Sequence, residues 1–200
     1  MTSKRKEELR LDHKIIGEMV AYDSSVFDVG CGDGDLLEYL VLNKKVKGTG
    51  VEISEAAIYK CVEKGLSVSH EDIDTGLTEY PDTMFDYVIF NQTMQQVNKP
   101  KEAILEALRI GKKVIIGFPN FCYLKSRFQL FFCGHVPVTP SLPYSWYDTP
   151  NRHFLSIKDF EEFCDMHKIV IEKKYFITEK NTIRIFPNLF ALNAIFQISK

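Results

Sequence analysis

A short segment rich in glycine and aspartate follows a β-branched, aromatic run and precedes a run of leucines. Its sequence is Asp28-Val29-Gly30-Cys31-Gly32-Asp33-Gly34. Glycines let the backbone turn sharply there and let a ligand approach without a Cβ in the way. Because parallel sheets bind ligands at the carboxyl ends of their strands, this segment predicts a binding loop between a strand and a helix. Its candidate binding residues are Asp28, Gly30, Gly32 and Asp33.

The spacing of the glycines separates this loop from the dinucleotide-binding fingerprint. That fingerprint is G-x-G-x-x-G, whereas the third glycine here comes one residue earlier, as G-x-G-x-G. An acidic residue, Asp28, also precedes the glycines. A carboxylate repels a pyrophosphate but accepts hydrogen bonds from an ammonium group, so the loop favours a cationic ligand without phosphates.

A second carboxylate lies at the end of the next strand-like run. Glu52, which is followed by Ile53, comes 20 residues after Gly32, where an acidic residue can bind the hydroxyls of a ribose. A ligand with a ribose, a cation and no phosphate fits S-adenosylmethionine. The alternative is a tight turn whose acids only face solvent, and the placement of Glu52 favours the binding site.

Two further positions follow the third and fourth strand-like runs. Asp72 and Ile73 follow the third run, where a carboxylate and an apolar side chain could hold the amine and the face of an adenine. Asn91 ends the fourth run, beside the expected methyl-donor end of the site. Ordinary loop polarity explains each of these residues equally well when it is taken singly.

Strand-like and helix-like patterns alternate over the first 118 residues. Helical patterns lie between the expected strands and before the first one, where Asp12 is expected to cap the helix. Ser54 is a second candidate cap, and Pro100 fits the first turn of a third helix. This alternation predicts an α/β fold with a parallel, doubly wound sheet and helices on both faces. The expected strands cover residues 25–29, 46–53, 66–68, 85–90 and 113–118.

The last third of the chain follows a different pattern. Residues 119–152 hold five prolines and many aromatic residues, which predicts a helix and a long surface excursion. Ser156 and Asp159 have the spacing of a capping box at the start of another helix. Two strand-like runs, 169–177 and 191–198, predict an antiparallel pair at the edge of the sheet.

Length and charge limit the classes of function. The 200 residues are enough for one domain with a sizeable core. A net charge of −2 predicts no general attraction to nucleic acid or membranes, and neither a transmembrane helix nor a signal peptide is expected. The basic residues near the N-terminus alternate with acids, so a solvated tail is expected rather than a binding patch. These basic residues are Lys4, Arg5, Lys6 and Arg10.

The cysteines predict no metal centre and no disulfide framework. There are five of them, with no C-x-x-C pair and no histidine cluster at the spacing of metal ligands. Reduced and mostly buried thiols are therefore expected, and these favour a cytoplasmic protein.

At the glycine loop the sequence resembles the class I S-adenosylmethionine-dependent methyltransferases. From about Arg10 to the C-terminus it is more specifically similar to the methionine biosynthesis protein MetW family. The segment at 142–151 is the most specific, because the general methyltransferase pattern does not require it. The segments that carry the resemblance are the glycine loop, Phe85-Asp86-Tyr87-Val88-Ile89, Phe118-Pro119-Asn120-Phe121 and Leu142-Pro143-Tyr144-Ser145-Trp146-Tyr147-Asp148-Thr149-Pro150-Asn151.

This resemblance implies a class I methyltransferase (Rossmann-like) fold, with seven mostly parallel strands of which the last is antiparallel. One methyltransferase-like domain would span residues 11–200 after a flexible tail of residues 1–10. The resemblance also implies a role in homoserine acylation, in partnership with a homoserine O-acyltransferase, and it brings no catalytic residue. An S-adenosylmethionine site would be lined by Asp28, Gly30, Gly32, Glu52 and Asp72.

Two hypotheses of function remain open at this point. In the first, the protein binds S-adenosylmethionine and supports the acyltransferase, with Tyr144, Trp146 and Tyr147 as a contact surface. In the second, it methylates a small molecule, with acceptor chemistry drawn from the same region. The candidates for that chemistry are Tyr144, Tyr147, Asp148 and His153, which a proline-stiffened loop that buries aromatic rings explains equally well.

Overall fold

The computed structural model describes residues 9–200, apart from the side chains of residues 75 and 76. The expectation of a flexible tail falls mostly on residues 1–8, including Lys4, Arg5 and Lys6, which lie outside the described residues. Arg10 is described, and it lies directly before the first helix.

The centre of the structure is a seven-stranded sheet in the order β3-β2-β1-β4-β5-β7-β6. Strand β7 pairs antiparallel with both of its neighbours, and the remaining pairs are parallel. The prediction of a mostly parallel sheet whose last strand is antiparallel is therefore confirmed. The strands are β1 (Ser25–Val29), β2 (Lys47–Glu52), β3 (Ser67–His70), β4 (Phe85–Asn91), β5 (Gly111–Pro119), β6 (Val170–Ile177) and β7 (Asn193–Ser199).

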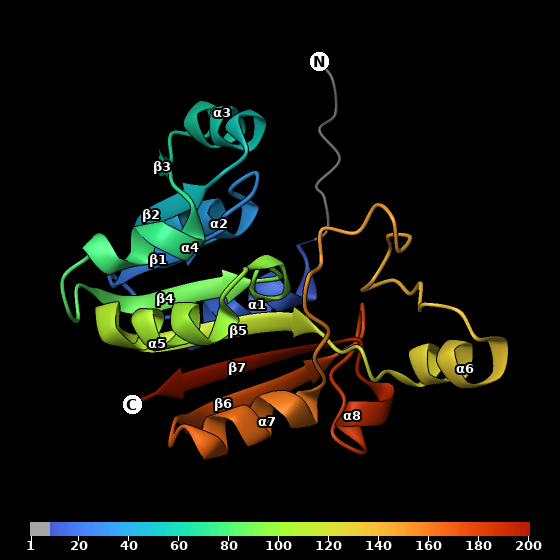
Figure 1. Cartoon of the computed structure of the whole chain (residues 1–200). Coiled ribbons are helices and arrows are strands. Elements are labelled where there is room, and N and C mark those ends of the chain that lie inside the picture. Colours follow the sequence, from blue (N-terminus) through green and yellow to red (C-terminus); the bar gives the residue numbers. More distant parts are fainter. Residues whose placement is uncertain (1–8) are drawn as a thin grey trace.

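Helices cover both faces of this sheet (Figure 1). The longer ones are α1 (Leu11–Met19), α2 (Asp35–Lys44), α3 (Glu55–Glu63), α5 (Pro100–Ile110), α6 (Leu124–Cys133) and α7 (Ile157–Met166). The short ones are α4 (Ile73–Gly76), α8 (Pro187–Phe190) and the 3₁₀ turns at Leu77–Glu79 and Met94–Gln96.

Side-chain alternation along β1 divides the core into two layers. Phe27 and Val29 pack in the layer that α5 and α7 cover. Val26 packs in the layer that α1 and α2 cover. Because successive side chains point to opposite faces of a sheet, Asp28 projects to the same side as Val26, toward α1. One carboxylate of an otherwise apolar strand therefore lies beneath the first helix.

Two of the predicted helix starts are confirmed by the structure, and one predicted helix cap is wrong. The capping box of Ser156 and Asp159 is present, with both of its hydrogen bonds, and Pro100 begins α5 as expected. The prediction that Asp12 caps the first helix is wrong, because Asp12 lies inside α1. Its carboxylate accepts hydrogen bonds from the side chains of Arg10 and Asn91 instead.

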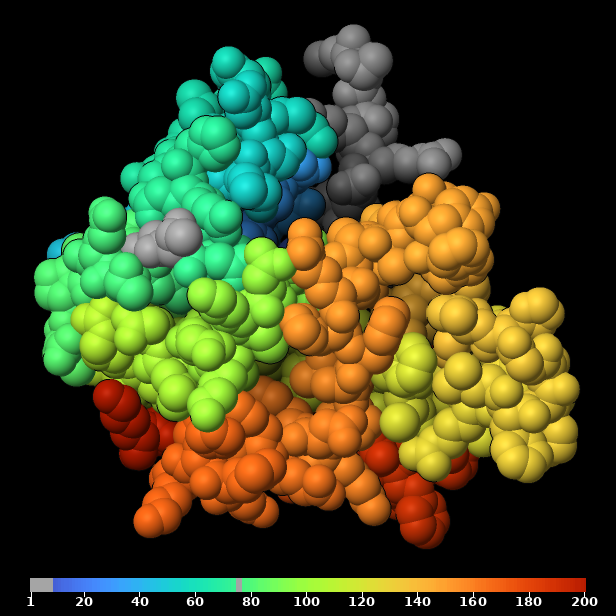
Figure 2. All heavy atoms as spheres, in the orientation of Figure 1, coloured from blue at the N-terminus to red at the C-terminus, as the bar shows by residue number. Residues whose placement is uncertain are grey.

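Helix α6 projects from the body of the molecule on the side where β5 ends (Figure 1). It buries one side chain, Ser126. After it, residues 134–156 run over the surface with no helix or strand of their own, as the proline content predicts. Together, α6 and this excursion make up one flank of the molecule (Figure 2).

All five cysteines are free thiols, and those at 31, 61 and 164 are buried. Among residues 9–200, no helix is both long enough and apolar enough to cross a membrane.

Phe196 is one of the largest fully buried side chains of the core. It is fully buried in β7, and its ring centroid lies 4.8 Å from that of Phe160 and 5.8 Å from that of Phe118. We expect Phe196→Ala to lower the free energy of unfolding by about 3–5 kcal/mol, measured by urea denaturation. The control is Phe131→Ala, at a ring that is 82% exposed, where a loss below about 0.5 kcal/mol is expected. Equal losses in the two variants would contradict this description of the core.

Candidate functional site

The glycine loop turns back over the end of β1 in a conformation that requires glycine. Gly30 and Gly32 have φ of +73° and +54°. A Cβ on Gly30 would lie 2.4 Å from Cγ2 of Thr93, so the residues after β4 pack directly on the loop. A Cβ on Gly32 would meet nothing within 4 Å, which leaves the backbone of Gly32 open to a ligand.

A cleft of about 270 Å³ lies between this loop, the end of β4 and the first turn of α1. It forms where β1 and β4 are neighbours, with Asp28 in register with Ile89. The winding of the sheet reverses there, and doubly wound sheets bind their ligands at such points. The residues that line the cleft are Arg10, His13, Asp28, Gly30, Cys31, Gly32, Asp33, Asp35, Leu36 and Asn91.

Asp28 is the most unusual group in the cleft. Its side chain is 1% exposed, and its Oδ2 atom has no hydrogen-bond partner among the described residues. Burial, helped by the charge of Glu52, raises the pKa of Asp28 to about 7. A buried acceptor without a donor is costly, and a ligand with a cationic N–H group would remove that cost.

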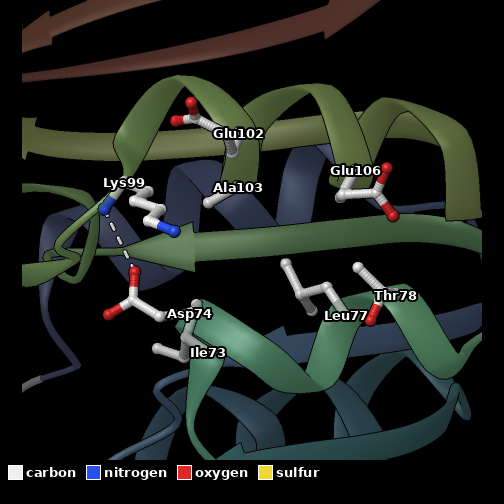
Figure 3. A pocket seen from close by; sticks show the side chains of 8 residues that line it. All are labelled: Ile73, Asp74, Leu77, Thr78, Lys99, Glu102, Ala103 and Glu106. Atoms are coloured by element: carbon white, nitrogen blue, oxygen red, sulfur yellow. Dashed lines mark hydrogen bonds between the residues drawn. The ribbon is translucent and has the colours of Figure 1, made fainter.

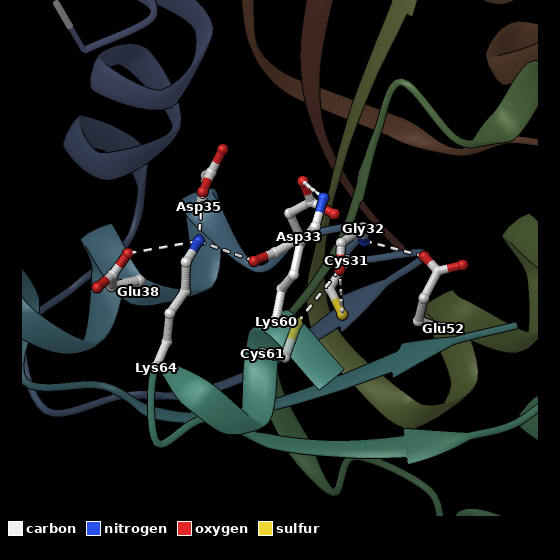
Figure 4. A network of polar contacts seen from close by, with 9 residues as sticks. All are labelled: Cys31, Gly32, Asp33, Asp35, Glu38, Glu52, Lys60, Cys61 and Lys64. Atoms are coloured by element: carbon white, nitrogen blue, oxygen red, sulfur yellow. Dashed lines mark hydrogen bonds and ion pairs between the residues drawn. The ribbon is translucent and has the colours of Figure 1, made fainter. Parts of the chain in front are cut away.

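Glu52 lies at the end of β2 and holds the other side of the loop (Figure 4). One carboxylate oxygen accepts from the N–H of Gly32 at 2.9 Å, and the other accepts from the N–H groups of Ile53 and Ser54. A carboxylate has about four sites for donors, so a ribose hydroxyl can still bind to it. Glu52 thus contacts the glycine loop directly, and its ribose role stays a prediction.

Two lysines, one in α3 and one at its C-terminal cap, pair with the acids Asp33 of the loop and Asp35 of α2 (Figure 4). Lys60 pairs with Asp33 at 2.7 Å, and Lys64 pairs with Asp35. Cys61 of the same helix donates to the carbonyl of Gly32. The negative charges of Asp33 and Asp35 are thus balanced on the side of the loop that faces α3.

The first turn of α1 forms a wall of the cleft that sequence reasoning missed. Asp12, which is 5% exposed, accepts from Nε and Nη2 of Arg10 and from Nδ2 of Asn91 at the end of β4. Arg10, the last residue of the expected tail, is bound to this buried carboxylate while its side chain stays 59% exposed. The sequence indicates this ion pair only through the short separation of Arg10 and Asp12, which are two residues apart.

Four predicted binding residues are absent from the lining of the cleft, and one of them, Glu52, reaches it through its hydrogen bond to Gly32. Ile53 is 63% exposed. Asp72 accepts from the N–H of Asp74 and caps α4. Ile73 packs partly against the core and lines a small cavity of about 60 Å³ between α4 and α5 (Figure 3). This cavity is too small for a nucleoside, and the adenine role of these residues stays a prediction.

The candidates for acceptor chemistry also lie away from the glycine loop. Tyr144 and Tyr147 are exposed. His153 lines a separate apolar groove between α5 and α7. None of these side chains, nor that of Asp148, lines the cleft beside Asp28. In the described part of the chain, no group of three or more His, Cys, Asp or Glu residues is placed to hold a metal ion.

Comparison with known proteins places the chain in a family. The family model described as methionine biosynthesis protein MetW matches residues 10–198. The chain belongs to the MetW family. A relative from Rhodopirellula baltica, named bifunctional methionine biosynthesis protein MetXA/MetW, is 33% identical over 189 residues. Those residues are 90% of this MetW-family chain and 30% of the relative.

A second relative matches a smaller part of the MetW-family chain. It is the carboxy-S-adenosyl-L-methionine synthase of Campylobacter jejuni, which is 31% identical over 101 residues, covering 48% of this chain and 42% of the synthase. The chain thus spans less than half the length of either relative.

Solved structures show the fold. An S-adenosylmethionine-dependent methyltransferase of Thermotoga maritima has a TM-score of 0.66 at 17% identity, over 95% of this chain and 88% of the other. One from Archaeoglobus fulgidus has a TM-score of 0.63 at 17% identity, over 94% of each chain. The class I methyltransferase fold of this MetW-family protein is therefore established.

The raised pKa of Asp28 makes stability depend on pH. Between pH of about 4 and about 7, the folded state keeps a proton that the unfolded state has released, so the free energy of unfolding falls as the pH rises. Over this pH range the free energy of unfolding falls by up to about 4 kcal/mol. We expect Asp28→Asn to remove this fall.

Urea denaturation of both proteins at pH 5 and pH 8 measures the effect. The difference between the two proteins isolates Asp28 from other groups that titrate in this range, such as His13. If the wild type loses no more stability than Asp28→Asn between the two pH values, the proposed environment of Asp28 is incorrect.

Proposed function

We propose that this MetW-family protein binds S-adenosylmethionine in the cleft beside the glycine loop and acts as the partner of a homoserine O-acyltransferase. The observation that carries the ligand proposal is Oδ2 of Asp28, a buried acceptor without a donor at the edge of an open cleft. The ammonium group of S-adenosylmethionine supplies such a donor.

The remaining residues fit the other parts of this ligand. Glu52 has one acceptor site left for a ribose hydroxyl, and the open face of Gly32 admits the ligand to the backbone. Asp72 and Ile73 are proposed to meet the adenine. When bound, S-adenosylmethionine would supply an electrophilic methyl group on a sulfonium, which an in-line displacement transfers.

A partner role is supported by the relative from Rhodopirellula baltica, whose name joins MetXA and MetW in one bifunctional protein. Two functions in one chain are physically coupled, and separate chains with the same functions need an interface to achieve this. We infer that the partner of this protein is the homoserine O-acyltransferase that the family resemblance implies.

The flank made by α6 and residues 134–156 is the proposed contact surface. Phe131 and Phe132 of α6 are 82% and 69% exposed, and Trp146 is 72% exposed. Patches of this kind mark protein contacts, and buried aromatic residues supply most of the energy of such contacts. The charged side chains of this flank are three cations, Lys125, Arg127 and Arg152, and one acid, Asp148. The partner face should therefore be apolar with carboxylates at its rim.

A short chain of contacts links this surface to the ligand cleft. Thr93, which packs on the loop, donates to the carbonyl of Gly30. Two residues later, the carbonyl of Gln95 accepts from the backbone N–H groups of Arg152 and His153, where the surface excursion returns to the body. Occupancy of the cleft can in this way affect the base of the contact surface.

A second candidate function is methyl transfer to a small molecule. The observation that favours it is the fold, which solved methyltransferases share over nearly the whole chain. Transfer of labelled methyl from S-adenosylmethionine to added small-molecule acceptors would establish this activity, whether or not a partner is present.

Ligand binding is tested by Glu52→Ala. Wild-type protein should show a melting temperature that rises with the concentration of S-adenosylmethionine. We expect Glu52→Ala to weaken binding by about tenfold to a hundredfold, because hydrogen bonds from the ribose to a charged acceptor are lost. Glu55→Ala, which removes an exposed carboxylate three residues away, is the control and should bind as the wild type does. A wild-type melting temperature that does not respond to the ligand would end the ligand proposal.

Partner binding is tested by Phe131→Ala and Trp146→Ala. We expect each variant to bind purified homoserine O-acyltransferase at least tenfold more weakly than the wild type, as truncation of a buried aromatic anchor does. Tyr59→Ala is the matched control, since Tyr59 is 70% exposed on α3, away from this flank. If both test variants associate with the acyltransferase and activate it normally, the α6 flank is not the interface.

A further inference from the structure

A second apolar surface lies beside the α6 flank, in the connection from β6 to β7. Ile185 and Phe186 are 73% and 72% exposed there, and Phe190 of α8 is 41% exposed. Exposed apolar side chains that gather in one place mark contact sites. We call residues 185–190 the α8 turn.

Phe186 holds a backbone conformation that does not suit its side chain. Its φ and ψ are +47° and +54°, in the left-handed region, which costs free energy for a residue with a bulky side chain. Pro187 follows it, and a residue before proline favours extended backbone. Strain of this kind persists at functional sites, and glycine would remove it, so the phenylalanine needs a reason other than the shape of the turn.

Packing within the described residues does not supply that reason. The backbone of Phe186 holds the turn, because its carbonyl accepts from the N–H groups of Leu189 and Phe190. The ring itself stays mostly exposed. A side chain that strains its backbone and leaves its ring in solvent has the properties of an anchor for a partner, since aromatic anchors supply much of the energy of protein contacts.

The α8 turn is fixed to the start of α6. Arg127 of α6 donates from Nη2 to the carbonyl of Asn188 at 3.3 Å. The buried side chain of Asn120, which follows β5, donates to the same carbonyl and to that of Ala191. Figure 1 shows α6 and α8 at the same end of the sheet. A partner that contacts the α6 flank therefore meets the α8 turn as part of one surface.

The charges beside the exposed rings have one sign. Residues 180–192 carry Lys180 and Arg184 and no acid, and α6 carries Lys125 and Arg127 and no acid. Apolar rings with cations at their edge match an apolar pocket that carboxylates surround. We propose that Phe186 enters such a pocket on the homoserine O-acyltransferase, so that the contact extends from the α6 flank across the α8 turn. This inference rests on the proposed function and adds a second anchor to it.

The test is Phe186→Gly, which removes the ring and the strain together. We expect this variant to bind purified homoserine O-acyltransferase at least about tenfold more weakly than the wild type in isothermal titration calorimetry. Its melting temperature should rise by about 2 °C, because glycine adopts the left-handed conformation without steric cost. Lys168→Gly is the matched control, since Lys168 has a φ of +56° at the opposite end of β6. This control should also gain stability, and it should bind the acyltransferase as the wild type does.

Three results would overturn the inference while the α6 contact stands. In the first, Phe186→Gly binds as the wild type does although Phe131→Ala does not. In the second, Phe186→Gly loses binding and also melts at a lower temperature, which would show that Phe186 supports the fold. In the third, sedimentation of the protein alone shows that the wild type self-associates and Phe186→Gly does not, so that the α8 turn meets a second copy. If the wild type does not bind the acyltransferase at all, the proposed partner role itself fails, and this inference fails with it.

Discussion

Gly30 and Thr93 approach each other more closely than any side chain at position 30 would permit, since a Cβ there would lie 2.4 Å from Cγ2 of Thr93. This contact brings the loop after β1 and the segment after β4 together at the reversal point of the sheet. Asp28 and Asn91 then line one cleft, and the first turn of α1 is tied to the same place through Asp12. The candidate site therefore requires glycine at position 30.

The site is also a place where the protein gives up stability. Oδ2 of Asp28 is buried without a donor, and its raised pKa reflects this. Around it, the other acids are compensated, Asp33 and Asp35 by Lys60 and Lys64 and Asp12 by Arg10. Two buried acceptors of residues that line the cleft, Oδ2 of Asp28 and Oδ1 of Asn91, are left without donors, and a buried acceptor of this kind calls for a partner such as a ligand.

Binding and contact surfaces occupy different parts of the fold. The cleft is polar and lies over β1 and β4, whereas α6 and the excursion after it present aromatic rings beyond the end of β5. The strand order and the glycine loop determine the cleft, and other class I methyltransferase folds can have both features. The aromatic flank includes residues 142–151, the segment on which the sequence resemblance to the MetW family most depends.

The sequence by itself determined the glycine loop, the place of Glu52 and the alternation of strands and helices. The loop depends on residues next to one another, and the place of Glu52 follows from the regular strand-helix-strand unit. It also indicated the antiparallel edge pair and the capping box at Ser156. Only the tertiary structure decided that β7 lies between β5 and β6, and that Asp12 binds Asn91 across 79 residues instead of capping its own helix. It likewise decided that α6 stands uncovered and that Arg10 and His13 line the same cleft as Asp28. These outcomes depend on which distant surfaces come to lie side by side, and local periodicity holds no information about that.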